Sequence, residues 1–204
     1  DNYLGGYTEI DTNLDWAGKT LYTLTKHKFD TNADEIVVKD MFEYTDQDRL
    51  SIHKQQINSD PEQLIVSNTY DELGQLISKN VGGIDTTGAI GLQKVDYTYN
   101  IRGWLKQIND VNTIGNDLFA FKISYNDPVN ATTALYNGNI SETHWKTAND
   151  NILRTYEYFY DKLNRLTNAI YKNEASILNS YGESLTYDKN GNIQTLNRAG
   201  GLED

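Results

Sequence analysis

The chain has 204 residues, of which 29 are acidic and 18 basic, so its formal net charge is −11 at pH 7. This charge argues against nucleic acids and anionic membrane surfaces as partners, because both attract basic protein surfaces. Only 38% of the residues are hydrophobic and none of the apolar runs approaches about 18 residues, so we expect no membrane insertion. Cysteine is absent, which excludes disulfide bonds, thiolate nucleophiles and cysteine-ligated zinc.

Residue usage favours short strands and tight turns. The sequence contains 15 Tyr, 23 Asn and only 2 Pro. Tyrosine is common in strands and asparagine in turns. The chain begins at Asp1 with neither an initiator Met nor an apolar leader, so we expect a piece of a longer protein or a processed form.

A seven-residue frame recurs along the chain. In order, its copies occupy residues 14–20, 44–50, 70–76, 99–105, 160–166 and 187–193, and a divergent hairpin signal lies at 136–140. Repeats of about 25 to 35 residues indicate a stacked array. We therefore predict that residues 1–204 form one array of about seven hairpin units, with anchors near Leu14, Tyr44, Tyr70, Tyr99, Tyr136, Tyr160 and Tyr187.

The frame has the chemistry of a three-residue hairpin loop. The residue after the anchor closes an Asx-turn on the backbone ahead, as in Asp71, Asn100, Asp161 and Asp188. Four residues after the anchor comes a type that tolerates positive φ: Gly18, Asp48, Gly74, Gly103, Asn164 and Gly191. A type I turn with a G1 bulge requires that type there. The anchor then faces the residue six positions on, which pairs Tyr44 with Leu50, Tyr70 with Leu76, Tyr99 with Leu105, Tyr160 with Leu166 and Tyr187 with Ile193.

The stretches between the frames favour strands as well. Residues 64–66, 119–125 and 154–160 alternate or are rich in β-branched and aromatic types, while glycines interrupt residues 82–91 as in a loop. A single hairpin is marginally stable in water, so neighbouring hairpins must join edge to edge. The predicted fold is all-β, a continuous curved or spiral sheet of stacked antiparallel hairpins.

The recurring frame resembles the signature of the YD-repeat, or RHS-repeat, family. That signature is Tyr-Asp-x-x-Gly-Arg-Leu, often preceded by Tyr-x-Tyr, and the closest matches are residues 70–76, 97–105, 158–166 and 187–193. The resemblance covers roughly residues 12–198. It implies a sheet that spirals into the wall of a hollow shell. No motif that closes such a shell is found, and seven hairpins are too few to enclose a cargo domain.

The resemblance also implies a function and a location. Family members are large secreted or cell-surface proteins, among them polymorphic toxins that enclose a C-terminal effector. We therefore expect a non-enzymatic shell segment of an exported bacterial protein, whose partners are the rest of the parent chain and its enclosed domain. Export implies a secretion machinery as a further partner, and one alternative is that the chain is a substrate of an outer-membrane translocon.

Catalytic, metal and cofactor motifs are not convincing in this sequence. His27, His53 and His144 are isolated from one another and from any nucleophile pattern. Asp30–Asp34 begins like a calcium loop but lacks the later glycine and glutamate, so a solvated turn is the better interpretation. We expect no enzyme activity, no metal and no cofactor.

The aromatic residues leave a second function open. Tryptophan and tyrosine on an open sheet face can stack on sugar rings, and Trp104 and Trp145 are the candidate residues. The chain would then be a cell-surface adhesin that binds glycans or a partner protein. The alternative is that these aromatic side chains only pack within and between the hairpins.

Overall fold

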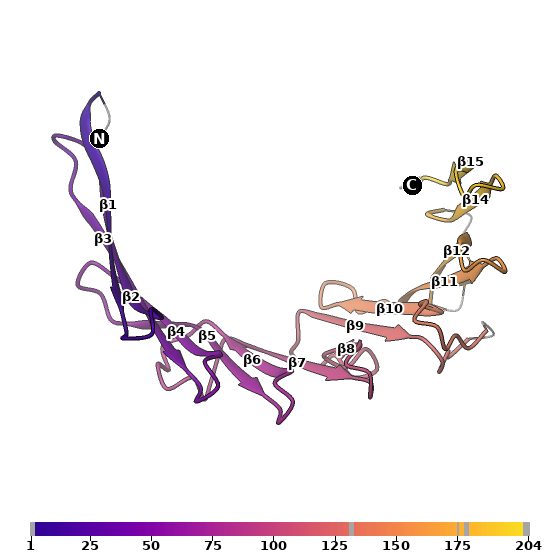
Figure 1. Cartoon of the computed structure of the whole chain (residues 1–204), viewed down its shortest axis with the longest axis horizontal. Coiled ribbons are helices and arrows are strands. Elements are labelled where there is room, and N and C mark those ends of the chain that lie inside the picture. The colour runs from indigo at the N-terminus through magenta and orange to yellow at the C-terminus, as the bar shows by residue number, and fades with distance from the viewer. Residues whose placement is uncertain (1–2, 131–132, 175, 178–179, 202–204) are drawn as a thin grey trace. The chain divides into compact units, whose positions relative to one another are not determined.

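The computed structural model describes residues 3–130, 133–174, 176–177 and 180–201. Within these residues the regular structure consists of β-strands alone, which confirms the all-β prediction (Figure 1). This part of the chain accordingly contains no helix capable of crossing a membrane. The strands are β1 (Gly5–Leu14), β2 (Thr20–Asp30), β3 (Ile36–Tyr44), β4 (Leu50–Ile57), β5 (Gln63–Tyr70), β6 (Leu76–Val81), β7 (Gln93–Tyr99), β8 (Leu105–Ile108), β9 (Phe119–Ser124), β10 (Glu142–Thr147), β11 (Arg154–Tyr160), β12 (Leu166–Asn173), β13 (Ser176–Ile177), β14 (Glu183–Tyr187) and β15 (Ile193–Arg198).

Successive strands pair in chain order. Each strand from β1 to β12 is antiparallel to the next, β14 and β15 continue the order, and β13 pairs with β12. The chain forms two compact units, Asp1–Asp96 and Tyr97–Asp204. Their boundary falls within β7, whose residues 93–96 pair with β6 and whose residues 97–99 pair with β8. The pairing confirms the stacked hairpins, and the spiral course stays a prediction.

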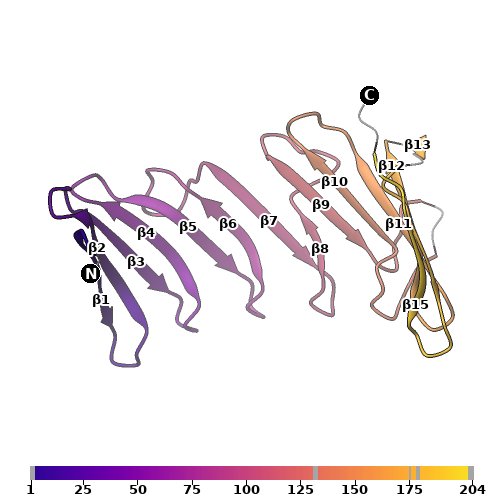
Figure 2. The same cartoon turned by 90° about the horizontal axis from the view of Figure 1, so that it is seen from above.

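Six hairpin loops share the predicted backbone conformation. The residue four positions after the anchor has a φ between 61° and 90° in all six, namely Gly18, Asp48, Gly74, Gly103, Asn164 and Gly191. Its N–H donates to the carbonyl three residues earlier at 2.9–3.2 Å. The register places Tyr44 opposite Leu50, Tyr70 opposite Leu76, Tyr99 opposite Leu105, Tyr160 opposite Leu166 and Tyr187 opposite Ile193, each at a bulge. The predicted turn and pairing are confirmed. Within the first unit these loops lie side by side at one end of the strands (Figure 2).

The residue after the anchor closes each loop with its side chain. Asp161 Oδ1 accepts from the N–H groups of Leu163 and Arg165 at 2.9 and 3.0 Å. The bond from the Arg165 backbone is the largest cause of a lowered pKa of Asp161. Asp71 and Asn100 accept in the same way at 2.8–3.0 Å. These bonds satisfy the loop N–H groups that have no ladder partner, and so they hold the turn in place.

Buried side chains are concentrated in the second unit. Among the described residues of the first unit, Leu64 is the one buried hydrophobic residue, with 1% of its surface exposed. The second unit buries Val111, Ala120, Tyr125, Ala169 and Tyr171. It also buries polar side chains of β9, β10 and β11. The difference follows from the connections, because in the second unit the long segments that flank β9 lie against a face of the sheet.

Candidate functional site

Five anchor tyrosines each connect their hairpin to the one before it. Their phenolic O–H groups donate to a backbone carbonyl at the start of the preceding hairpin's second strand, or just before that strand. The bonds run from Tyr44 to Thr20 (2.8 Å), Tyr70 to Leu50 (2.9 Å), Tyr125 to Leu105 (3.1 Å), Tyr160 to Ile140 (2.8 Å) and Tyr187 to Leu166 (2.7 Å). We call these five bonds the tyrosine ties. They explain why tyrosine, and not phenylalanine, holds the anchor position.

The ring of the anchor is covered by a residue of the preceding hairpin. Arg49 lies 5.8 Å from the Tyr70 ring centroid, and Arg165 lies 4.5 Å from that of Tyr187. Both cations occupy the fifth position after their own anchor. Trp104 occupies the same position and its ring centroid lies 5.2 Å from that of Tyr125. Trp104 therefore makes the contact that arginine makes elsewhere in the repeat.

The anchor predicted at Tyr136 is wrong, and the structure places Tyr125 in that role. Tyr136 lies in the connection between β9 and β10 and is 70% exposed. Tyr125 makes the tyrosine tie, and the next N–H bond across the hairpin runs from Ser141 to Ser124 at 2.8 Å. The inserted connection removes the six-residue spacing on which the sequence argument depended. The signal that was missed is Tyr125–Asn126, which lies 26 residues after Tyr99.

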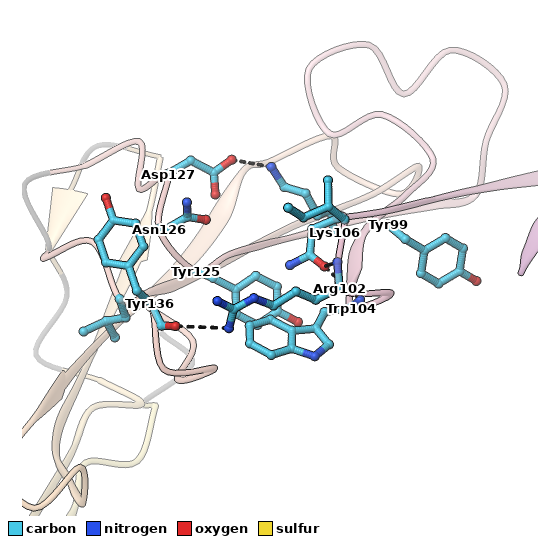
Figure 3. Close-up of a pocket in the computed structure, with 11 residues that line it drawn as sticks. Tyr99, Arg102, Trp104, Lys106, Tyr125, Asn126, Asp127 and Tyr136 are labelled. Atoms are coloured by element: carbon cyan, nitrogen blue, oxygen red, sulfur yellow. Dashed lines mark hydrogen bonds and ion pairs between the residues drawn. The ribbon is translucent and has the colours of Figure 1, made fainter. Parts of the chain in front are cut away.

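A cavity of about 540 Å³ opens beside Trp104 (Figure 3). Four aromatic and two amide residues line it, namely Tyr99, Trp104, Tyr125, Tyr136, Asn100 and Asn126. The ring of Tyr99 points away from the other three rings (Figure 3). We call this cavity the aromatic pocket. The structure thus places one of the two predicted glycan-stacking residues in a concave site.

The charged groups of the aromatic pocket already have partners, but only two of them pair with an opposite charge. Arg102 lies 5.2 Å from the Trp104 ring centroid, and its Nη1 donates to the Tyr136 carbonyl at 3.3 Å. Lys106 forms an ion pair with Asp127 on the opposite side of the pocket (Figure 3). Burial raises the pKa of Tyr125, so this phenol stays a neutral donor. Aromatic faces, amides and charged groups that already have partners suit a neutral, polar, ring-shaped ligand.

Trp145 belongs to a different place in the second unit. Its ring stacks on Tyr156 at 5.7 Å and lies 6.0 Å from Tyr171, in an aromatic cluster on β10, β11 and β12. It does not line the aromatic pocket. The two predicted glycan-stacking residues are therefore not brought together, and Trp145 has the surroundings of a packing residue.

His27 and His53 are each hydrogen-bonded to a side chain of a neighbouring strand. His27 Nδ1 lies 2.8 Å from the Thr8 hydroxyl, and His53 Nε2 lies 2.8 Å from Asp40 Oδ1. Asp30 Oδ1 accepts from the N–H groups of Asn32 and Ala33, which is the solvated turn predicted in place of a calcium loop. In the part of the chain that the structure describes, no three His, Asp or Glu side chains are placed to hold a metal ion.

A buried polar cluster on β10 and β11 escaped the sequence argument. Glu142, His144 and Thr155 are 0%, 4% and 2% exposed. Glu142 Oε2 lies 3.1 Å from His144 Nε2, and His144 Nδ1 lies 3.0 Å from the Thr155 hydroxyl. Burial is the largest cause of a lowered pKa of His144. Alternation puts Glu142 and His144 on one face of the strand, but nothing local in the sequence shows that this face is covered.

Among known proteins, similarity is found with solved structures and not with family models or curated sequences. No protein-family model matches the sequence, and no curated protein matches it. Among solved structures, a chain in the Tc holotoxin pore of Photorhabdus luminescens is similar over 98% of this chain, with 12% identity and a TM-score of 0.35. This chain spans 14% of the length of that neighbour.

Proposed function

We propose that this chain is a structural, non-enzymatic wall segment of a large exported bacterial protein of the YD-repeat type. Its role is to form a β-sheet wall that shields or displays another part of the parent chain. The observation that carries the proposal is the set of tyrosine ties, which fasten five hairpins to the hairpins that precede them. An anchor tyrosine pairs within its own hairpin and bonds the preceding hairpin, as Tyr160 does, so it can join successive hairpins into one sheet.

The chemistry of the side chains is consistent with this role. The Asp side chains of the frame are used by the loop backbone, as at Asp161 and Asp188. Both ring nitrogens of His144 are engaged within the sheet. The frame residues thus have backbone and packing duties that account for their recurrence without a reaction.

Electron microscopy of the parent protein, combined with protease digestion, tests the wall. We expect a hollow or spiral particle whose enclosed domain resists digestion, while a compact solid particle would refute the proposal. Replacing Tyr160 and Tyr187 by Phe removes two ties and should speed digestion of the enclosed domain. Tyr136→Phe is the matched control, since Tyr136 makes no tie and is 70% exposed.

We propose glycan recognition at the aromatic pocket as a second candidate function. It is favoured by the volume of about 540 Å³ and by the aromatic rings of Trp104, Tyr125 and Tyr136 (Figure 3). The ligand class would be a neutral saccharide, whose C–H faces pack on the rings and whose hydroxyls bond the amides. The chain would then serve as part of a surface adhesin.

A glycan array decides the second candidate. Trp104→Arg is the informative variant, because arginine at the same frame position covers the anchor ring in two other hairpins. We expect saturable binding to a neutral glycan that Trp104→Arg abolishes and that Trp145→Phe leaves intact. A failure of the whole array to bind would remove this function and leave the wall untouched.

A further inference from the structure

Glu142 holds a segment of the connection between β9 and β10 against the sheet. Its Oε2 accepts from the Val129 N–H at 2.7 Å and its Oε1 from the Asn130 N–H at 2.9 Å. The carboxylate is fully buried. Backbone donors that approach a buried carboxylate form charge-assisted bonds, which are about twice as strong as neutral ones. The segment Asn126–Asn130 is thus fastened at its end by one side chain.

The protonation of His144 is determined by its two neighbours. The Glu142 carboxylate only accepts hydrogen bonds, so the imidazole donates from Nε2 at 3.1 Å. Nδ1 is then an acceptor for the Thr155 hydroxyl at 3.0 Å. A neutral imidazole completes this chain of bonds. A charged imidazole would cost free energy here, because His144 is only 4% exposed.

The same segment forms part of the aromatic pocket. Asn126 and Asp127 line the pocket, and they precede Val129 and Asn130 by only three residues. Asp127 also forms the ion pair with Lys106. The position of these two side chains in the pocket therefore depends on whether Glu142 holds the end of the segment.

We propose that Glu142 and His144 form an acid-released clamp that sets the position of the segment Asn126–Asn130 and thereby one wall of the aromatic pocket. At neutral pH the clamp is closed. Acidification can charge His144, which removes the Nδ1 acceptor of the Thr155 hydroxyl and places a cation in the interior. It can also neutralise Glu142, which weakens the bonds to the two backbone N–H groups. Either event favours release of the segment. The clamp goes beyond the wall function, and only its consequence for a ligand rests on the second candidate function.

The groups that face the clamp make the direction of the response clear. They are Glu142 on the same strand, Lys122 on β9, Glu157 on β11 with its ion-pair partner Lys172 on β12, and Glu174 in the adjoining cavity. Burial and Lys122 lower the pKa of His144, and they outweigh Glu142 and Glu157, which raise it. Release restores the pKa toward the usual 6.5. The released form therefore binds more protons, so release increases as the pH falls below about 6.5.

Hydrogen exchange of the Val129 and Asn130 amides tests the clamp directly. For the unmodified chain we expect their protection, corrected for intrinsic exchange rates, to fall by about tenfold between pH 7.5 and pH 5.5. Amides of the β11–β12 ladder should keep their protection over that range. If Val129 and Asn130 follow the ladder amides at both pH values, the proposal is wrong.

Two substitutions at one register position separate the clamp from general destabilisation. Glu142 lies opposite Glu157 across β10 and β11, but Glu157 pairs with Lys172 and not with the segment. Glu142→Gln should speed exchange of the two amides at pH 7.5 by about tenfold or more, whereas Glu157→Gln should leave them protected. Equal effects of the two variants would overturn the proposal. If Glu142→Gln does not fold, the pH series on the unmodified chain still decides.

The consequence for the pocket has a separate readout. In a Trp16→Phe, Trp145→Phe background, Trp104 is the remaining tryptophan. Acrylamide quenching of its fluorescence should increase from pH 7.5 to 5.5, and His144→Gln should flatten that increase. Unchanged quenching alongside faster amide exchange would refute the coupling to the pocket.

Discussion

Removing single tyrosine hydroxyls measures what the ties contribute. Tyr44 and Tyr70 form a matched pair in the first unit, because each is half-buried, each donates to a carbonyl of the preceding hairpin and each ring is covered by a cation. They differ at the acceptor. The Leu50 carbonyl receives a second donor, Asn68 Nδ2 at 3.1 Å, while the Thr20 carbonyl receives one side-chain donor among the described residues.

The structure therefore predicts unequal costs for the same substitution. Tyr44→Phe leaves the Thr20 carbonyl without its side-chain donor and should destabilise the first unit by about 1 kcal/mol. Tyr70→Phe leaves Asn68 in place and should cost about 0.5 kcal/mol. Combining Asn68→Ala with Tyr70→Phe removes both donors, so the double variant should cost more than the sum of the two single variants.

Urea titrations followed by amide signals of β2 to β5 provide the assay, because the two units need not unfold together. With a denaturant slope of about 1–3 kcal/mol/M, a loss of about 1 kcal/mol moves the midpoint by roughly 0.3–1 M. The reasoning is refuted if Tyr70→Phe costs as much as Tyr44→Phe, or if the Asn68 and Tyr70 variants are simply additive.

Three further predictions concern the loops and Trp104. Gly74→Ala should reduce the free energy of unfolding by at least ~1–2 kcal/mol, because φ of Gly74 is +84° and the new Cβ would meet Arg49. Asn164→Gly should change it by less than about 0.5 kcal/mol. Thermal or urea unfolding measures both. The Arg154 side chain lowers the pKa of Asp150 to about 2. The stability that this carboxylate contributes is therefore complete above about pH 4 and is lost as the pH falls through 2. An NMR titration of the carboxyl group measures this pKa, and Arg154→Gln should raise it toward 3.8. The free energy of unfolding of Trp104→Arg should lie within about 0.5 kcal/mol of that of the unmodified chain, because arginine can keep the contact with the Tyr125 ring. Trp104→Ala loses that contact and should be less stable.

Much of the local structure could be predicted because its causes lie within seven consecutive residues. Two properties of the sequence itself are sufficient. One is an Asp or Asn side chain that accepts hydrogen bonds from the N–H groups two and four residues later, and the other is a residue tolerant of positive φ at the end of the loop. Both features appear at Asp161 and Asn164 as the frame predicts. The register of Tyr160 with Leu166 then follows from the loop length.

The anchor of the β9–β10 hairpin could not be placed by the same reasoning. At Tyr125 the loop is replaced by a long connection, so the return strand begins only at Glu142. What identifies Tyr125 is its bond to the Leu105 carbonyl of another hairpin. Ties of this kind join residues about 20 positions apart, and they become visible only when neighbouring hairpins are placed side by side.

The sequence by itself determined the six hairpin turns of the frame, their pairing and the all-β character of the described residues, because these depend on backbone conformations that short side chains select locally. Only the tertiary structure decided that Trp104 covers the next anchor ring and that Glu142 and His144 are buried. The burial of a polar side chain depends on which distant segment covers it. That covering segment here is the connection that departs from the repeat, whose course no periodicity predicts.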